Sequence, residues 1–384
     1  MLKDVTRYIK REVERELWAR AAGRCQFYGC NRILYKSPVT QEPINISEKA
    51  HIYSFSQYGA RGWGLFAKNK KALNDLSNLM LVCHDCHKSI DLEKDGGRYQ
   101  AELLIKWKLE HERRVAIVTG VDPIKKSYVV LYGANIGDET SILQPEHANW
   151  ALFPEWYPAD EKPIYLDMTW EGRDDQPNYW VTEERNLRQR FDRVIRPLID
   201  EGHHFSIFGF APMPLLIRIG TLFTDKIPSQ VYQLQREPEQ TWQWSITQND
   251  PDFKVNLPEN YEHPPALIIA LSSAIAHERV TSVLDTNVSI WELTIADPHN
   301  DFLKSRDQLS KFREIVRKLM VQISKKHGNS TPLAIFPAMP VAPSVELGRV
   351  RMPKAEMPWV IYDQNNRLGA FVKALQIGGV PDEQ

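Results

Sequence analysis

Residues 83–91 read CHDCHKSID, and this stretch decides the fold of the first third of the chain. Cys83 and Cys86 have the C-x2-C spacing of a zinc knuckle, and Cys25 and Cys30 form a second pair with four residues between them. These are the only cysteines of the 384-residue chain. Two such pairs match a tetrahedral Zn²⁺ site of four thiolates. We therefore expect a structural zinc ion, and free buried cysteines are the alternative.

The same stretch contains two further metal-binding side chains. If a helix begins near His87, the i, i+4 spacing of His87 and Asp91 brings an imidazole and a carboxylate to one helix face. His51 lies in a short apolar stretch that reads as a strand, and a glycine-containing loop follows it. Asn78 lies nine residues before His87. The predicted local order is strand, loop, strand, helix.

The order of these residues resembles that of the HNH endonuclease family. His51, Asn78 and His87 are flanked by GRCQFYGC (23–30) and LVCHDCH (81–87), and the resemblance covers about residues 20–115. It implies a ββα-metal fold with an associated zinc knuckle, closed by a helix over AELLIKWKLEHERRV (101–115). It also implies that His51, Asn78 and His87 form the catalytic set, with His51 as general base and Asn78 holding its imidazole. His87 and Asp91 would then bind a catalytic divalent cation, Mg²⁺ or Mn²⁺.

One position departs from the family pattern. Many HNH enzymes have an acidic or histidine ligand immediately before the base, where this chain has Ala50. Water or a substrate phosphate can complete the coordination, because Mg²⁺ sites commonly retain waters. Phosphodiester hydrolysis needs an activated water and a neutralised leaving group, and an imidazole and a divalent cation can divide these tasks.

Charge is unevenly distributed along the chain, although the net charge is -1. Residues 1–126 carry 23 Lys and Arg against 15 Asp and Glu, a net of +8, and the remainder carries -9. A basic module suits a polyanion, because binding releases condensed counterions. Solvated charge on surface helices is the alternative. The cations expected to contact a DNA backbone are Arg61, Lys68, Lys70 and Lys71.

The composition also bears on location. No apolar run approaches the roughly 20 residues needed to cross a bilayer, and the N-terminal stretch has no signal-peptide core. We therefore expect a cytoplasmic protein without a membrane partner.

The rest of the chain alternates short apolar runs with helical patterns. The runs are SYVVLYGAN (127–135), PIYLDMTW (163–170), HFSIFGFAP (204–212), PALIIALSS (265–273), SIWELTI (289–295) and PLAIFPAMP (332–340). Helical patterns cover residues 184–202 and 306–326. Alternation of this kind predicts an α/β fold with parallel, Rossmann-like sheets.

An internal repeat divides this region. Phe208, Pro212 and Gly220 have spacings of four and eight, and the same residue types recur at 336, 340 and 348, each 128 positions later. A duplicated half-domain explains this pattern, and chance similarity of apolar strands is the alternative. Two facing α/β halves create a crevice at their strand ends, which suits a ligand that is itself nearly twofold, such as a cyclic dinucleotide.

The stretch from Phe210 to Trp244 resembles the SAVED domain, a fusion of two CARF-like halves that senses cyclic oligonucleotides, and GRVRMPKAEMPWVIYD (348–363) fits its closing segment. The resemblance covers about residues 128–384. Aromatic faces for bases and cations for phosphates would form the ligand site. The expected ligand contacts are Tyr232, Arg236, Trp242, Trp244, Arg349 and Lys354.

The sequence thus predicts an α/β protein with two functional regions. An HNH domain over 1–120 is joined by a linker, 121–127, to a SAVED domain with halves near 128–255 and 256–384. This pairing resembles CBASS anti-phage effectors. It implies a homo-oligomer, a dimer that assembles further on activation, in which a cyclic di- or trinucleotide triggers cleavage of double-stranded DNA. The alternatives are a modification-dependent HNH restriction endonuclease, and a non-catalytic zinc-stabilised protein that binds DNA or senses nucleotides.

Overall fold

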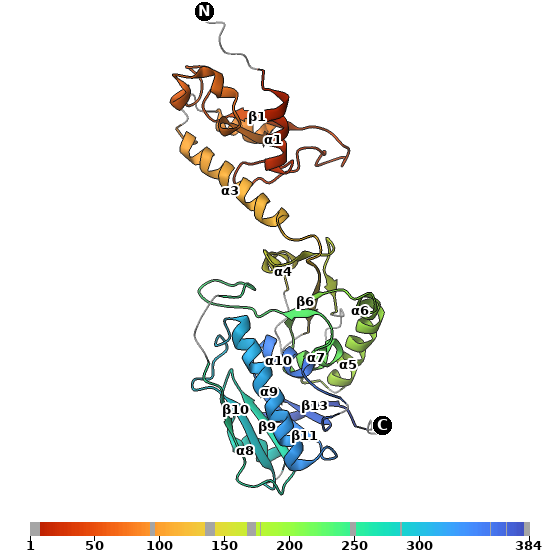
Figure 1. Cartoon of the computed structure of the whole chain (residues 1–384). Coiled ribbons are helices and arrows are strands. Elements are labelled where there is room, and N and C mark those ends of the chain that lie inside the picture. Colours follow the sequence, from red (N-terminus) through yellow and green to blue (C-terminus); the bar gives the residue numbers. More distant parts are fainter. Residues whose placement is uncertain are drawn as a thin grey trace, which may run out of the picture. The chain divides into compact units, whose positions relative to one another are not determined.

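The computed structural model describes residues 8–92, 97–134, 143–166, 174–176, 178–245, 251–284, 286–353, 355–365 and 367–379. It divides into two compact units, Met1–Asp122 and Pro123–Gln384 (Figure 1). Each unit is described by itself below. Within the described ranges, no helix combines the length and the apolar character that crossing a membrane requires.

The first unit is built on an antiparallel pair of strands. Strand β1 (Ser47–His51) pairs with β2 (Leu79–Cys83) in a register that runs from Ser47↔Cys83 to His51↔Leu79. The connection between them contains three short 3₁₀ turns, η1 (Gly64–Phe66), η2 (Lys70–Asn74) and η3 (Leu76–Asn78). Helix α2 (His84–Ile90) follows β2 directly, so the predicted order of strand, loop, strand and helix is confirmed.

Two longer helices complete this unit. Helix α1 (Arg11–Ala21) precedes β1, and α3 (Ala101–Thr119) covers the closing helix expected from the sequence. All five residues of β2 are buried, and the core around them includes Leu17 of α1 and Leu104 of α3. A strand that is apolar at every position can be covered on both faces, which explains why LMLVC does not alternate. This burial holds the β2–α2 junction, and with it Cys83, in place.

The second unit contains two sheets. The first has the order β4-β3-β6-β7, with β5 also paired to β3, and all of these pairs are parallel. Its strands are β3 (Lys126–Gly133), β4 (Tyr157–Pro158), β5 (Ile164–Tyr165), β6 (Phe205–Phe210) and β7 (Ser229–Val231). The intervening helices are α4 (Pro145–Leu152), α5 (Tyr179–Arg190), a π-helical turn η4 (Phe191–Ile195), α6 (Arg196–Asp200) and α7 (Met213–Phe223).

The second sheet has the order β13-β12-β11-β9-β10-β8, parallel in its centre and antiparallel at both edges. Its strands are β8 (Lys254–Asn256), β9 (Pro265–Ala270), β10 (Ser289–Thr294), β11 (Leu333–Ala338), β12 (Trp359–Asn365) and β13 (Ala370–Ile377). Its helices are α8 (His277–Leu284), α9 (Arg306–His327) and α10 (Val341–Arg349). Strand β8 pairs with β10, so this half begins slightly before the predicted boundary at 255/256.

The internal repeat is confirmed by matching ring contacts. Phe208 of β6 stacks on Tyr232 with ring centroids 4.4 Å apart, and Phe336 of β11 stacks on Tyr362 at 4.6 Å. A third ring meets each phenylalanine edge-on, Trp242 at 5.2 Å in the first half and Phe371 at 5.0 Å in the second. The two halves therefore repeat a packing motif as well as a spacing.

The repeat also governs how the halves join. Helices α7 and α10 cross so closely that a Cβ on Gly220 would lie 2.0 Å from the Val345 carbonyl oxygen. A Cβ on Gly348 would lie 1.9 Å from the Ile217 carbonyl oxygen. Both members of each contact are shifted by 128 residues, which is the reciprocity of an isologous twofold contact. The second unit thus has an internal pseudo-twofold axis at this crossing.

Candidate metal centre and active site

The four cysteines form one cluster, as the spacing predicts. Their Sγ atoms lie within 4.8 Å of one another, and the Sγ atoms of Cys30 and Cys83 are 3.9 Å apart. A tetrahedron with Zn–S bonds of about 2.3 Å has edges of roughly 3.8 Å, so the cluster fits Zn²⁺. None of the four forms a disulfide. Burial raises the pKa of the Cys25 thiol to about 12, and hence cation binding here must displace protons.

The cluster ties the start of α2 to the loop that precedes β1. Cys83 ends β2, and Cys86 lies in α2 immediately before His87. The Cys83 backbone N–H donates to Cys25 Sγ at 3.3 Å. A metal bound by these sulfurs therefore restrains the helical turn that carries His87.

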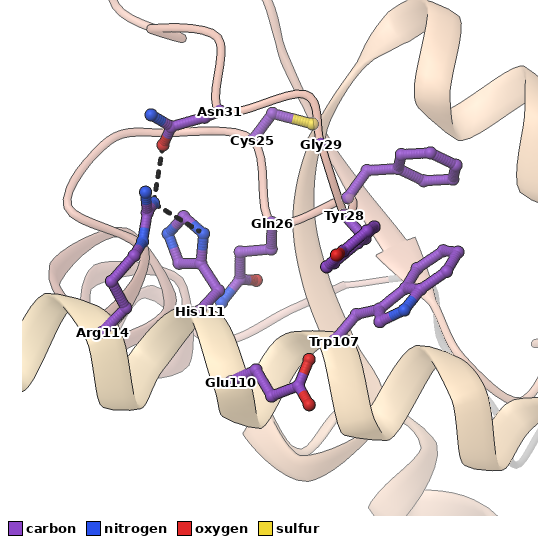
Figure 2. A pocket seen from close by; sticks show the side chains of 10 residues that line it. Cys25, Gln26, Tyr28, Gly29, Asn31, Trp107, Glu110, His111 and Arg114 are labelled. Carbon is purple, nitrogen blue, oxygen red and sulfur yellow. Dashed lines mark hydrogen bonds between the residues drawn. The ribbon is translucent and has the colours of Figure 1, made fainter. Parts of the chain in front are cut away.

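A cavity of about 240 Å³ lies between the Cys25–Cys30 loop and α3 (Figure 2). Arg114 of α3 points towards Asn31 and His111 in this view, donating to Asn31 Oδ1 at 2.7 Å and to His111 Nδ1 at 3.3 Å. His111 Nε2 in turn donates to the Ala21 carbonyl at 3.0 Å, and burial lowers its pKa. These bonds attach α3 to the residues on either side of the Cys25–Cys30 loop, and they give the His111 imidazole a structural role.

His51 is the last residue of β1, and its imidazole is held by an asparagine. Its Nε2 lies 3.0 Å from Asn74 Oδ1. The amide of Asn74 is oriented by donating from Nδ2 to the Tyr8 carbonyl at 3.3 Å, so Oδ1 faces the ring as an acceptor. With Asn74 Oδ1 as the acceptor, this contact favours the His51 tautomer that is protonated on Nε2.

Asn78 has a different task from the one expected. It is buried, and it donates both amide hydrogens to backbone carbonyls, those of Tyr53 at 3.0 Å and Leu73 at 2.9 Å. Its Oδ1 accepts from the Tyr53 backbone N–H at 2.7 Å. Asn78 thus fixes the chain that leaves His51, and the side chain that bonds the imidazole is that of Asn74. The sequence interpretation assigned this direct contact to the wrong asparagine.

The second expected pair lies on one helix face. His87 Nε2 and Asp91 Oδ2 are 3.6 Å apart, a separation that one cation with bonds of about 2.1 Å can bridge. Both side chains are partly exposed, so waters can fill further positions. Ala50 is 1% exposed and faces the core. The donor set therefore fits a divalent cation with two protein ligands and several waters.

Arg61 was expected on a DNA-binding surface, and this was wrong. Its side chain is only 2% exposed, and Nη2 donates to Asp91 Oδ1 at 2.9 Å. Lys68 and Lys71 are exposed, whereas Lys70 places its Nζ 4.0 Å above the Trp63 ring. Lys68 and Lys71 therefore remain exposed cations, and Arg61 is internal.

Two of the expected ligand contacts are internal in the second unit. Tyr232 is fully buried beneath Phe208, where it packs as part of the core. Arg349 is 4% exposed and is held by Glu346 Oε1 at 2.7 Å and by the carbonyls of Thr224, Ile227 and Ser229. A buried guanidinium needs such partners to offset its desolvation. Arg349 thus stabilises the α10 end, and neither side chain is open to a ligand.

The other expected contacts lie at different places. Trp242 borders a cavity of about 200 Å³ with Gln144, His147 and Gln240 among its walls. Trp244 borders a separate cavity of about 430 Å³ beside Glu155 and Arg306. Arg236 is exposed, and Lys354 lies outside the described residues. The two tryptophans therefore border different cavities.

Family models match a part of each unit. A family model for HNH endonucleases matches residues 25–94, and one described as the "SMODS-associated and fused to various effectors sensor domain", SAVED, matches residues 187–377. The chain joins an HNH endonuclease domain to a SAVED domain. The HNH domain contains the cysteine cluster, His51, His87 and Asp91, and its class is that of the phosphodiester hydrolases.

Solved structures resemble the chain at low identity. The Acinetobacter baumannii Cap4 SAVED/CARF-domain receptor with the cyclic trinucleotide 2'3'3'-cAAA has a TM-score of 0.44 and 14% identity, over 72% of this chain and 56% of that one. The Moraxella osloensis Cap4 receptor has a TM-score of 0.39 and 15% identity, over 72% and 54%. The chain thus spans little more than half the length of these Cap4 proteins. No curated protein matches it.

Two residues of the HNH domain were missed or misassigned from the sequence. Asn74 was not singled out, although it stands four residues before Asn78 in the same connection. Arg61 was grouped with surface lysines because a lone arginine in a glycine-containing loop has no distinguishing pattern. No sequence signal distinguished it.

Proposed function

We propose that the protein is a cyclic-nucleotide-activated, metal-dependent endonuclease that degrades double-stranded DNA in anti-phage (CBASS) defence. The observation that carries the nuclease part is one guanidinium shared by both halves of the site. Arg61 Nη2 donates to Asp91 Oδ1 at 2.9 Å and to the backbone carbonyl of His51 at 3.4 Å. The residue expected as base and a residue expected as metal ligand are therefore joined through a single side chain.

In this proposal His51 is the general base. Its imidazole accepts a proton from the attacking water, while Asn74 holds the ring through the contact with Nε2. His87 and Asp91 hold the divalent cation, Mg²⁺ or Mn²⁺. When bound, such a cation supplies Lewis-acid stabilisation of the phosphate and of the leaving oxygen. Asn78 acts indirectly, through the backbone that follows the base.

Double-stranded DNA is the proposed substrate because of charge. The net of +8 over residues 1–126 favours a polyanion, and the exposed Lys68 and Lys71 supply phosphate contacts near the site. Contacts of this kind carry no sequence information, so cleavage should depend little on sequence. It should fall steeply as salt concentration rises.

A cyclic di- or trinucleotide is the proposed activator. The pseudo-twofold crossing of α7 and α10 supports a ligand with near-twofold symmetry, and the SAVED match supports a sensor of this class. Trp242, Trp244 and Arg236 remain the proposed contacts, because the tryptophans border cavities and the arginine is exposed. Aromatic faces can stack bases, and a guanidinium can bind phosphate. The protein is proposed to act as a homo-oligomer, a dimer that assembles further when the activator binds.

Plasmid digestion with and without a panel of cyclic di- and trinucleotides tests the proposal. Cleavage should require Mg²⁺ or Mn²⁺ and one member of the panel, and His51→Ala should abolish it. Mass spectrometry of small molecules retained by the purified protein would identify the activator. Equal cleavage in every tube would contradict gating, and equal cleavage by His51→Ala would contradict the nuclease site.

A further inference from the structure

Arg61 joins three segments of the HNH domain, two of which carry the proposed catalytic residues. Its guanidinium donates to the carbonyls of Ile52, at the end of β1, and of Ile90, at the end of α2. It also donates to the Tyr99 carbonyl, just before α3, at 3.4 Å. These contacts lie 9, 29 and 38 residues away along the chain. One side chain therefore sets the spacing between β1, α2 and the start of α3.

The guanidinium also has a specific relationship with Asp91. It bonds Oδ1 at 2.9 Å, while Oδ2 lies 3.6 Å from His87 Nε2. Asp91 Oδ1 is thus bonded by the buried Arg61 guanidinium, and Asp91 Oδ2 faces the His87 imidazole. The Asp91 side chain is 45% exposed at the C-terminal end of α2. A planar guanidinium can fix a carboxylate plane, which a lysine ammonium cannot do.

We propose that Arg61 is a positioning residue for the divalent cation, acting through Asp91. This inference rests on the proposed nuclease function. The orientation of Asp91 matters more because Ala50 supplies no ligand, so the cation depends on His87 and Asp91. Partners that orient a metal ligand typically contribute 10–100-fold in metal affinity, so roughly this loss is expected when Arg61 no longer orients Asp91.

Arg61→Lys isolates this role because it keeps the positive charge and removes the planar, multidentate geometry. Arg32→Lys is the matched control, since Arg32 pairs with Asp85 of the same helix at the same 2.9 Å but on the surface. Mn²⁺ binding is measured without DNA by electron paramagnetic resonance, on full-length protein with confirmed zinc content. Arg61→Lys should weaken the site about tenfold or more, and Arg32→Lys should leave it unchanged. Mn²⁺ affinity of a folded Arg61→Lys protein within twofold of the unaltered protein would overturn the proposal.

A second measurement avoids dependence on the variant's folding. In the unaltered protein labelled with ¹⁵N-arginine, adding Mg²⁺ should shift the Arg61 guanidinium resonance, because its carboxylate partner acquires a cation. The Arg32 resonance should stay in place. An unmoved Arg61 resonance at saturating Mg²⁺ would contradict the inference, whereas Mn²⁺ binding that His87→Ala leaves intact would overturn the proposed cation site itself.

Discussion

Gly220 on α7 and Gly348 on α10, which are 128 residues apart in the sequence, are the contact points at which these two helices cross. Each lacks the Cβ that would strike a backbone carbonyl of the opposite helix, at 2.0 Å for Gly220 and 1.9 Å for Gly348. Backbone atoms cannot rotate aside as the end of a side chain can. The two halves of the SAVED domain therefore pack backbone against backbone at this crossing.

Gly220→Ala and Gly348→Ala should each destabilise the SAVED domain. Overpacking typically costs about 1–3 kcal/mol, and a clash with rigid backbone lies at the upper end. Thermal unfolding of purified variants measures the effect. Gly209→Ala is the control, because its new methyl group would meet the Leu216 side chain at 2.8 Å and that side chain can move. Equal thermal unfolding midpoints for all three variants would contradict the close contact between α7 and α10.

Asn74 and Asn78 should separate catalysis from stability. Asn74→Ala removes the acceptor for His51 Nε2, so the cleavage rate should fall roughly tenfold, less than the 10²–10⁴-fold expected for loss of a base. Its melting temperature should change little. Asn78→Ala leaves buried backbone groups of Tyr53 and Leu73 without partners, at a cost of about 1–3 kcal/mol.

Rate assays and thermal melts on the same preparations measure both effects. A stable Asn78→Ala protein with a slow rate, beside a fast Asn74→Ala protein, would show that Asn78 is the catalytic asparagine after all.

Removing zinc should unfold the HNH domain and leave the SAVED domain intact. Structural zinc contributes about 10–16 kcal/mol of apparent binding free energy in small zinc domains, which exceeds the stability of a typical domain. We expect a strong chelator to make residues 8–122 sensitive to protease, while the second unit keeps its thermal transition. Cys86→Ser should have the same effect without a chelator. Retained protease resistance after complete zinc loss would show that the thiol cluster is dispensable.

Asp363 should make the stability of the SAVED domain depend on pH. Burial raises the pKa of this carboxyl to about 7, and the charge of Asp174 acts in the same direction. The folded state holds this proton more tightly than the unfolded chain, whose aspartate pKa is about 3.9. The stabilisation is therefore present below about pH 4 and is lost as pH rises through 7.

Asp363→Asn should remove this loss, which is at most about 4 kcal/mol. The variant should melt at a higher temperature than the unaltered protein at pH 8, with a smaller difference at pH 5. Asp297→Asn is the control, because that side chain is 94% exposed. An identical pH profile for Asp363→Asn and the unaltered protein would show that Asp363 titrates normally.

Short-range spacing accounts for most of what the sequence predicted correctly. The i, i+4 spacing of His87 and Asp91 depends on local geometry, and the structure confirms it. The C-x4-C and C-x2-C spacings are also short-range signals, although the cluster that they form joins two segments about 53 residues apart. The repeat of Phe208 and Phe336 is also a local pattern that occurs twice. Features of this kind keep their meaning whatever the chain does elsewhere.

Long-range contacts account for what was missed. Arg61 bonds carbonyls up to 38 residues away, and no periodicity encodes such contacts. The choice between Asn74 and Asn78 depends on how the 3₁₀ turns fold back over β1. Tyr232 and Arg349 are residue types that can bind a nucleotide. The same residue types also serve as a buried core ring and as a buried, hydrogen-bonded guanidinium. Only the packed structure distinguishes these roles.

The paired ring clusters of the SAVED domain show what a fused chain can do and a symmetric assembly cannot. Beneath Phe208 the edge-on partner is the indole of Trp242, and beneath Phe336 it is the phenyl ring of Phe371. In a homodimer both positions would be encoded by one codon and would have to change together. Covalent fusion releases each half to evolve alone, so one polypeptide can offer unlike walls to the two ends of a molecule that is not itself symmetric.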